Sequence, residues 1–298
     1  MCAAAALKDF GRRSVLLFGS TGALGSAVAD AFARANWRVI GCSTSGSSRK
    51  GKDTSRLQDL PGCSRAAVTP SPSHAFIEVK GLSTLSLREQ GDEILKQLQP
   101  LLATGPLLHA IICCSGAFAC SPVESAEFLS EAQHLVRANC YPSMLCAHVA
   151  ATLFNSQQEK KELPSPLVVL TGAAAVSSKT PTPSMIAYGC SKAYVHHLVR
   201  SLAAVASAKA AGDTAERGER AGPFRVVGIL PEMLDTPANR ASMPDVSAEQ
   251  RSKTWTEPKD IAEKLLRWAD GVEEATNGGI YVVRTREGQT QFVRRCDE

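Results

Sequence analysis

Hydrophobic positions alternate along the chain between short continuous apolar runs and longer segments with apolar residues three or four apart. In the first example, the apolar run 15–18 precedes a glycine-rich turn, the helically spaced Leu24, Val28 and Phe32, and a second run at 39–42. Short apolar runs predict buried strands, and the wider spacing predicts an amphipathic helix. A strand, a helix and a strand in this order are typical of a parallel βαβ unit with a right-handed crossover.

The same alternation continues to the end of the chain. The strand candidates are the apolar runs 15–18, 39–42, 75–79, 107–113, 167–170, 224–230 and 280–283. Helical spacing separates them, and Ile261, Leu265 and Trp268 predict a late helix packed on the sheet. We therefore expect an α/β Rossmann fold: one domain over residues 1–298, with a doubly wound, seven-stranded parallel sheet and helices on both faces.

Two segments interrupt the pattern. Residues 44–74 are rich in serine, glycine, proline and basic residues, and residues 208–223 mix alanine, glycine and charged residues. Such compositions bury too little apolar surface to fold on their own. Both segments predict exposed, flexible insertions rather than domain boundaries.

Composition places the chain among globular proteins. With 298 residues, 44% hydrophobic and 21% charged, it can bury a sizeable core. No apolar run approaches the ~20 residues of a membrane span, and the segment before the first strand is too short for a secretory signal. The ten cysteines include no CxxC pair, which favours reduced thiols over disulfides or a metal site. We expect a cytoplasmic protein that binds neither membrane nor metal.

Charge argues against nucleic acid as a partner. The formal charge is only +4, and the densest basic stretch, at residues 49–56, lies among serines and glycines without interleaved aromatic residues. The partners expected are therefore small molecules.

A glycine-rich turn joins the first predicted strand to the first helix. Gly19, Gly22 and Gly25 lack side chains at the place where backbone amides can approach a pyrophosphate at a helix N-terminus. The alternative is a turn whose glycines serve tight packing alone. The candidate cofactor-binding residues here are Gly19, Ser20, Thr21, Gly22, Ala23, Leu24 and Gly25.

The end of the second predicted strand bears on the choice of cofactor. Folds that select NADH usually place an acidic residue there, but this chain has Ser43, followed by Arg49 and Lys50. Hydroxyl and basic side chains suit a 2′-phosphate. We expect NADPH to be preferred and NADH to be used as well, with a solvated linker as the alternative interpretation of residues 44–50.

Tyr188 and Lys192 are four residues apart in a stretch with helical spacing, so they lie on one helix face. An ammonium group beside a phenol favours the phenolate and lowers the phenol pKa, which makes Tyr188 a candidate proton donor. The alternative is a surface pair on an amphipathic helix.

Together these features resemble the short-chain dehydrogenase/reductase family, with Asn139 ahead of the fifth strand and Thr236 after Pro231. The resemblance implies that Tyr188 donates a proton, that Lys192 holds the nicotinamide ribose, and that Asn139 orients the lysine through water. It also implies that Tyr188, Lys192 and three further residues contact the cofactor, namely Gly116, Pro231 and Thr236. For Asn139 the alternative is a polar residue that caps or fills a helix kink.

Three stretches narrow the resemblance: "GALGSAVADAFARANW", "PSMIAYGCSKAYVHHLVRSLA" and "LPEMLDTPANRASMP". They resemble the family members that reduce quinonoid dihydropteridines with NAD(P)H and so regenerate tetrahydrobiopterin. Phe118 falls where those members carry a tryptophan, so Phe118 and Tyr188 are the expected substrate-binding residues. A buried core phenylalanine is the alternative for Phe118.

One departure from the wider family supports the narrower resemblance. The serine that usually holds a substrate carbonyl after the fifth strand is absent from "LVVLTGAAAV". Thr171 is a possible substitute, whereas Ser177 and Ser178 lie too far along the chain. The alternatives are a broad carbonyl or quinone reductase, which the missing serine disfavours, and a non-catalytic NADPH sensor, which Tyr188 and Lys192 disfavour.

The helix that carries Tyr188 also predicts an oligomer. Its apolar residues are numerous enough to cover the sheet and to contribute to a second helix surface: Val195, Leu198, Val199, Leu202 and Val205. By analogy with the family, we expect a homodimer paired through this helix and the preceding one.

Overall fold

The computed structural model describes residues 13–43, 74–79, 85–103, 105–154, 164–177, 179–211 and 223–295. These residues form one eight-stranded sheet, in the order β3-β2-β1-β4-β5-β6-β7-β8. The strands are β1 (Arg13–Phe18), β2 (Arg38–Ser43), β3 (Ala75–Glu78), β4 (Leu107–Cys113), β5 (Leu167–Thr171), β6 (Arg225–Pro231), β7 (Gly279–Arg286) and β8 (Gln289–Arg294). All neighbouring pairs are parallel except β7 and β8, which are antiparallel.

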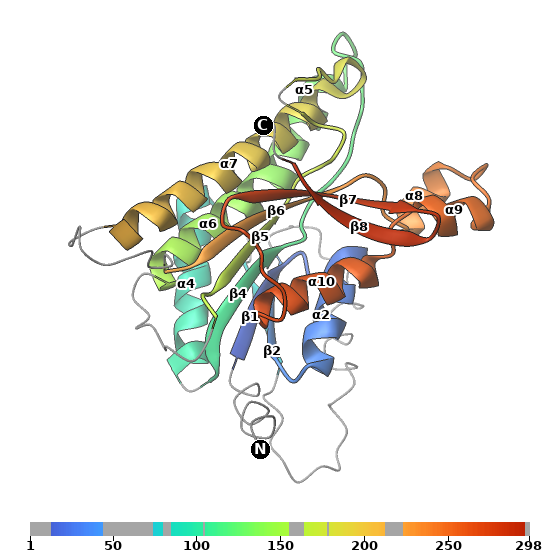
Figure 1. The fold of residues 1–298 in the computed structure, drawn as a ribbon. Helices are drawn as coiled ribbons and strands as arrows, with labels where there is room; N and C mark the ends of the chain where they lie inside the picture. Colours follow the sequence, from blue (N-terminus) through green and yellow to red (C-terminus); the bar gives the residue numbers. More distant parts are fainter. Residues whose placement is uncertain are drawn as a thin grey trace.

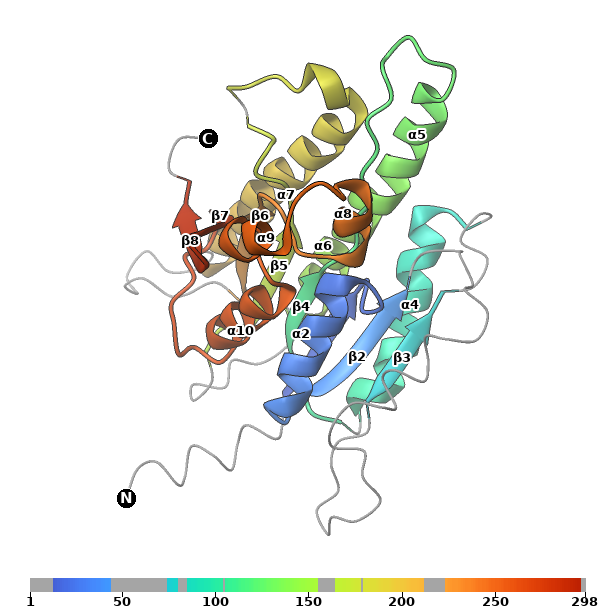
Figure 2. The same cartoon turned by 90° about the vertical axis from the view of Figure 1, so that its right-hand side faces the viewer.

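Helices cover both faces of this sheet, as Figures 1 and 2 show. One face carries α4, α6 and α7, and the other carries α2 and α10. The helices are α2 (Ala23–Arg34), α4 (Leu87–Ala103), α5 (Phe128–Leu135), α6 (Tyr141–Phe154), α7 (Ile186–Ala211), α8 (Pro237–Ser242), α9 (Ala248–Thr254) and α10 (Pro258–Ala269), with a π-helical turn η2 (Val136–Cys140) and a 3-10 turn η3 (Pro183–Met185). None of the described helices is long and apolar enough to cross a membrane.

The seven predicted strands are confirmed, but the sequence missed β8. This strand lies at the sheet edge and has mostly exposed or half-buried residues, so it lacks an apolar run. It follows β7 through a two-residue turn in which Glu287 and Gly288 both have positive φ angles, of 49° and 76°. Such a turn joins antiparallel neighbours, so the sheet is not wholly parallel as predicted.

The insertion predictions fall largely outside the described residues, which do not include 44–73 or 212–222. At two of their edges the structure describes ordinary elements. α7 continues to Ala211, past the predicted start of the second insertion at residue 208. His74 precedes β3, and its Nδ1 accepts a hydrogen bond from the Val39 amide.

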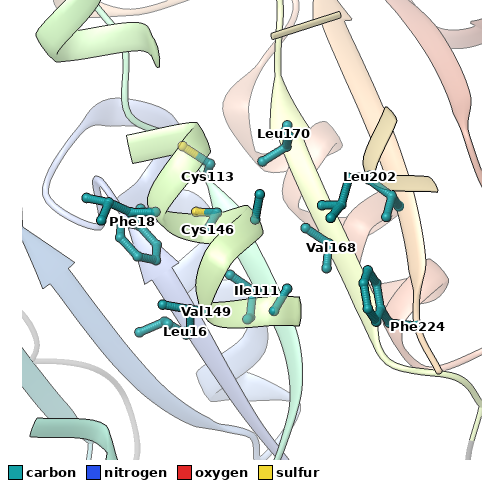
Figure 3. Close-up of a cluster of buried hydrophobic side chains, with 14 of the residues drawn as sticks. Leu16, Phe18, Ile111, Cys113, Cys146, Val149, Val168, Leu170, Leu202 and Phe224 are labelled. Carbon is teal, nitrogen blue, oxygen red and sulfur yellow. The ribbon is translucent and has the colours of Figure 1, made fainter. Parts of the chain in front are cut away.

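The core consists of two apolar layers, one on each side of the sheet. Figure 3 shows part of the layer under α6 and α7, where Leu16 and Phe18 of β1 meet residues of β4, β5 and α6. Val15 and Leu17 point the other way, toward Val28 and Phe32 of α2. A fully buried side chain of this size contributes about 1.5–3 kcal/mol. Because both faces are covered, the central strands are continuous apolar runs, as the sequence indicated.

The strand order places a crevice at the carboxyl edge of the sheet. From β1 the chain adds β2 and β3 on one side, and then crosses to add β4 on the other. The connections after β1 and β4 therefore leave in opposite directions. In doubly wound sheets, ligands bind at this switch point, beyond the carboxyl ends of the strands.

Candidate active site

The glycine turn lies at the switch point and requires glycine at two of its three positions. Gly19 has a φ of 75°, and a Cβ there would approach the Ser115 amide nitrogen to 2.7 Å. A Cβ on Gly25 would overlap the Gly19 carbonyl oxygen. The packing interpretation thus explains Gly19 and Gly25, but it does not explain Gly22, which meets only the Gly19 oxygen at an ordinary 3.5 Å.

The turn nevertheless has the features of an anion site. Gly22 is the N-cap of the twelve-residue helix α2, and no described side chain caps this helix or places an acid in its first turn. Thr21, Gly22 and Ala23 are exposed at the tip, whereas the Leu24 side chain belongs to the core. A helix N-terminus with free amides attracts phosphate.

Ser20 adds a polar group to this turn. The residue is buried, at 5% exposure, and its hydroxyl has no hydrogen-bond partner among the described residues. A buried hydroxyl without a partner is costly, so it points to a missing ligand. The backbone of Gly19 to Gly25 and the Ser20 hydroxyl therefore fit the pyrophosphate and adjacent ribose of a dinucleotide.

Ser43 ends β2 beside this turn, since the Gly19 amide donates to the Cys42 carbonyl over 3.1 Å. The structure also brings an acid that the sequence analysis did not consider. Glu78 of β3 is the register partner of Ser43 and is exposed. A carboxylate therefore approaches the end of β2 from the neighbouring strand. Arg49 and Lys50 lie outside the described residues.

Tyr188 and Lys192 share one face of α7, as predicted. The Lys192 Nζ atom lies 5.9 Å from the centre of the Tyr188 ring and donates a hydrogen bond to the Thr171 carbonyl over 3.1 Å. Lys192 is 4% exposed, and Tyr188 is partly exposed. The surface-pair interpretation is therefore wrong for Lys192.

The pKa of the Tyr188 phenol shifts in the direction opposite to the one expected. Burial raises the pKa of Tyr188 to about 12, and burial also lowers the pKa of Lys192 to about 8, against the opposing influence of the Cys113 and Cys140 thiols. In both groups loss of hydration is the largest cause of the pKa shift. At neutral pH the Tyr188 phenol keeps its proton, which is the form a proton donor needs.

Asn139 connects this helix to the loop after β4. Its Oδ1 accepts from the Ala117 amide at 2.8 Å, and its Nδ2 donates to the Ala117 carbonyl at 3.1 Å and to the Ser191 hydroxyl at 2.9 Å. The residue lies in the π-helical turn η2, a distortion frequent at functional sites. Asn139 is thus a tether rather than a helix cap, and the sequence analysis did not find its partner Ser191.

Gly116 shows how closely these groups converge. A Cβ on Gly116 would lie 3.0 Å from Asn139 Oδ1 and 3.2 Å from Lys192 Nζ. Both contacts are tighter than a side chain usually makes, so the glycine allows the loop after β4 to pass close to the amide and the ammonium.

Phe118 lies at the open rim of the site. Its side chain is 63% exposed, and its ring centre is 4.9 Å from that of Tyr188 at an interplanar angle of 72°. A buried core phenylalanine is therefore excluded. The two rings form an aromatic corner that suits a flat heterocycle.

The structure describes two hydroxyl side chains close in sequence to the missing serine, those of Thr171 and Ser177. The Thr171 hydroxyl donates to the Cys113 carbonyl over 2.7 Å, so its proton is already used. Ala173 is buried, and the Ser177 hydroxyl accepts from the Lys179 amide. The proposed Thr171 substitute is therefore wrong, and Ser178 lies outside the described residues.

Pro231 and Thr236 lie at the end of β6, on the same sheet edge. The Pro231 carbonyl accepts from the Ala174 amide, and Thr236 is the N-cap of α8, where its hydroxyl accepts from the Asn239 amide over 3.2 Å. Arg240 pairs with Asp235 through two contacts of 2.5 Å and 2.9 Å. The distinctive stretch "LDTPANR" thus builds a braced turn that positions Thr236.

Comparison with known proteins agrees with this geometry. No family model matches the chain. A curated dihydropteridine reductase of Dictyostelium discoideum is 27% identical over 282 residues, which cover 94% of this chain and 98% of that protein. The predicted resemblance to that group is therefore confirmed.

Solved structures share the fold at low sequence identity. A short-chain type dehydrogenase/reductase from Mycobacterium ulcerans has a TM-score of 0.64 at 19% identity, covering 92% of this chain and 88% of that one. ElxO with NADP bound has a TM-score of 0.65 at 13% identity, covering 91% and 96%. A 3-oxoacyl-[acyl-carrier protein] reductase with bound NAD from Brucella melitensis has a TM-score of 0.61 at 16% identity, covering 93% and 92%. The predicted Rossmann architecture is confirmed.

Proposed function

We propose that this protein reduces quinonoid dihydropteridine, of the dihydrobiopterin type, to the tetrahydropteridine with a reduced nicotinamide cofactor, and so regenerates tetrahydrobiopterin. The observation that carries the proposal is the convergence of Tyr188, Lys192, Asn139 and Phe118 beside the glycine turn, at one edge of the sheet. The similarity to a dihydropteridine reductase over 94% of the chain supports the substrate class.

The residues divide the reaction between them. When bound, the cofactor supplies a hydride, and the Tyr188 hydroxyl supplies the proton, so that the ring gains two electrons and two hydrogens. Lys192 holds the ribose hydroxyls, and Asn139 orients the lysine through a water while its amide fixes the loop after β4. The heterocycle packs against the corner that the Phe118 and Tyr188 rings form.

The absence of a second hydroxyl donor fits this substrate class. A simple ketone develops negative charge on one oxygen and gains from a second donor in the transition state. A quinonoid pterin is already electron-poor and accepts the hydride into a conjugated ring. One donor, Tyr188, is enough for it.

The test is oxidation of NADPH and NADH, followed by nicotinamide absorbance, with quinonoid dihydropterin and with a panel of ketones and quinones. We expect rapid pterin turnover, ketone turnover lower by roughly a hundredfold, and loss of activity in the matched Tyr188→Phe variant. Equal turnover of ketones would indicate a broad carbonyl reductase. Cofactor binding without turnover of any acceptor would indicate a sensor protein.

For the cofactor, we expect a modest preference for NADPH with residual use of NADH. Ser43 and the unpartnered Ser20 hydroxyl support it, because neither repels a 2′-phosphate and each can donate to it. Glu78 opposes it, which keeps the preference modest. A charge-assisted contact contributes ~1.5–3 kcal/mol, roughly ten- to a hundredfold in affinity.

Two variants test this preference in opposite directions. Ser43→Asp should shift the ratio of catalytic efficiencies toward NADH by about tenfold, and Glu78→Gln should shift it severalfold toward NADPH. Both ratios are measured by steady-state kinetics with each cofactor. Equal or better efficiency with NADH in the unaltered protein would contradict the preference.

A homodimer is supported by exposed apolar side chains on α5, η2 and α7. Leu129, Val136 and Val205 are 77%, 41% and 45% exposed. Of the predicted apolar stripe on α7, only Val205 is exposed. Val195, Val199 and Leu202 belong to the core, and Leu198 is half-buried. Sedimentation should show a dimer that dissociates in the double variant Leu129→Lys, Val136→Lys; a single 31.6 kDa species in the unaltered protein would refute it.

A cytosolic location is supported by thiol chemistry. The seven cysteines of the described residues are all free, four of them buried. Reduced thiols persist in the cytosol. Imaging of a fluorescent fusion should show a diffuse cytosolic signal, and an organellar pattern would contradict it.

A further inference from the structure

The segment after β5, residues 172–176, takes the place of the family's substrate-binding serine and is called here the β5 loop. It begins one residue after Thr171, whose carbonyl binds Lys192, and it is made of glycine, alanines and valine. Such small side chains have little to hold them in position. Two long side chains from distant parts of the chain hold the loop instead.

The first is His196, one helical turn beyond Lys192 on α7. Its Nε2 accepts a hydrogen bond from the Ala173 amide over 3.3 Å, and the residue is 3% exposed. The contact is close, because a Cβ on Gly172 would overlap the imidazole and the Leu230 side chain. Successive turns of α7 therefore hydrogen-bond this segment at two points, through Lys192 to Thr171 and through His196 to Ala173.

The second is Arg295, which follows β8 and lies 119 residues from its partner Val176. Its Nη1 donates to the Val176 carbonyl over 2.9 Å, and its Nη2 donates to the Ala174 carbonyl over 3.2 Å. Its backbone amide is fixed to the Ile280 carbonyl over 2.8 Å, so the arginine reaches the loop from a braced position.

The remaining backbone groups of the loop support the same arrangement. The Gly172 amide donates to the Ile229 carbonyl, the Ala174 amide to the Pro231 carbonyl, and the Val176 amide to the Ala173 carbonyl. With His196 and Arg295 included, the loop is fastened to α7, β6 and the end of β8. Its backbone is thereby fixed directly after Thr171, the residue whose carbonyl binds Lys192.

We propose that His196 and Arg295 are positioning residues that clamp the β5 loop as the wall of the substrate site. The proposal rests on the proposed reduction of a pterin. It assigns a task to the arginine that follows β8 and to a buried histidine that neither donates the proton nor binds the cofactor. A loose wall would misplace the substrate relative to Tyr188, and a displacement of about 1 Å can cost roughly a hundredfold in rate.

The test compares matched variants. His196→Gln keeps an acceptor near the position of Nε2, and His196→Leu removes it at similar volume. Arg295→Lys keeps the charge and one donor group, and Arg295→Met removes both. Active sites are counted by NADPH binding, so that misfolded protein does not count as lost activity.

We expect His196→Leu and Arg295→Met to raise KM for the pterin and lower kcat, for a loss of roughly ten- to a hundredfold in kcat/KM, with the Kd for NADPH unchanged. His196→Gln should recover most of the loss, and Arg295→Lys part of it. Unchanged KM and kcat in His196→Leu and Arg295→Met, or no recovery in His196→Gln, would overturn the proposal.

Amide hydrogen exchange separates a failed clamp from a failed function. In the unaltered protein the Ala173 amide should exchange slowly; in His196→Leu it should exchange faster, and in His196→Gln it should regain protection. This measurement needs no turnover. If the variants show the expected changes in exchange but the unaltered protein does not reduce pterin, the proposed function alone is refuted. If the Ala173 amide exchanges at the same rate in His196→Leu as in the unaltered protein, the clamp is refuted.

Discussion

The two edges of the sheet both bury a cation and both shift the pKa of nearby groups, yet they differ in what surrounds the charge. At the amino edge, Arg13 is 1% exposed and its Nη2 lies 2.7 Å from Asp270 Oδ1. The Trp37 indole donates to the same oxygen over 3.1 Å, and its ring lies 4.6 Å from the guanidinium carbon. The charge is therefore paired with a carboxylate and covered by an aromatic ring there.

At the carboxyl edge, Lys192 has a different environment. No carboxylate of the described residues pairs with it, and its nitrogen donates to the neutral Thr171 carbonyl. The exposed Phe118 marks an open rim nearby. The Lys192 ammonium is therefore available to bind a polar group of a ligand.

The comparison shows that a shifted pKa does not identify a site by itself. Burial lowers the pKa of His109, near the amino edge, to about 4, a larger shift than many catalytic groups have. His109 nevertheless lies among Trp37 and neighbouring strand residues, at 4% exposure. What distinguishes the functional edge is an exposed rim, unused backbone donors and an uncompensated charge. Four experiments test this distinction.

Tyr188→Phe should have the largest effect on catalysis. Turnover should fall by ~10²- to 10⁴-fold, toward the low end because an electron-poor pterin needs little acid assistance. Cofactor affinity and the free energy of unfolding should stay nearly unchanged. Steady-state kinetics and NADPH fluorescence titration measure the two properties, and near-full activity would remove Tyr188 from the mechanism.

Asp270→Ala should lower the free energy of unfolding and leave turnover unchanged. It leaves the Arg13 guanidinium buried without its carboxylate, which costs about 3 kcal/mol of unfolding free energy. Burial raises the pKa of Asp270 in spite of the arginine, in keeping with a costly site. Urea unfolding should show the loss, and kcat at low temperature should not change. Glu249→Ala, which breaks an exposed pair with Lys253, is the control and should not shift the midpoint.

His109 should make stability depend on pH. Its pKa is 6.5 when unfolded and about 4 when folded, so the unfolded state binds the proton more readily. The contribution is fully present above pH 6.5 and is lost as the pH falls toward 4, by about 3 kcal/mol in all. His109→Gln cannot titrate, so its unfolding free energy should fall less over this range. Parallel curves for the two proteins would contradict the shift.

Lys192 should make cofactor binding depend on pH, with the smallest effect of the four. Its folded pKa is about 8, so the ammonium is present below this pH and is lost above it. NADPH affinity should therefore fall by up to about tenfold as the pH rises through 8, as one charge-assisted contact disappears. Lys192→Met should bind NADPH weakly at every pH. A flat profile in the unaltered protein would show that the charge does not act on the cofactor.

Local patterns were sufficient for the central architecture. Strands such as β1 are buried on both faces, so they appear in the sequence as continuous apolar runs. The glycine turn is identified by the spacing of its three glycines. The four-residue spacing of Tyr188 and Lys192 is enough to put them on one helix face. These features depend on periodicity and on backbone conformation, which neighbouring residues determine.

Other features depend on contacts between distant segments, and the sequence could not show them. β8 is an edge strand with polar residues, so it has no apolar run that predicts a strand. Its hydrogen bonds to β7 define it instead. Glu78 reaches Ser43 only because β3 pairs with β2. The tether from Asn139 to Ser191 spans 52 residues, and Arg295 reaches the β5 loop across more than a hundred.

The sequence alone therefore determined the succession of the seven parallel strands and their helices along the chain, the glycine turn, and the identity of the Tyr188 and Lys192 pair. The tertiary structure alone decided the protonation of that pair, because hydration depends on how much of the chain closes over a group. An ammonium beside a phenol predicts a lowered pKa in water, but in the folded protein burial raises the pKa of Tyr188 to about 12. Spacing along a helix is a local property, whereas burial belongs to the whole fold.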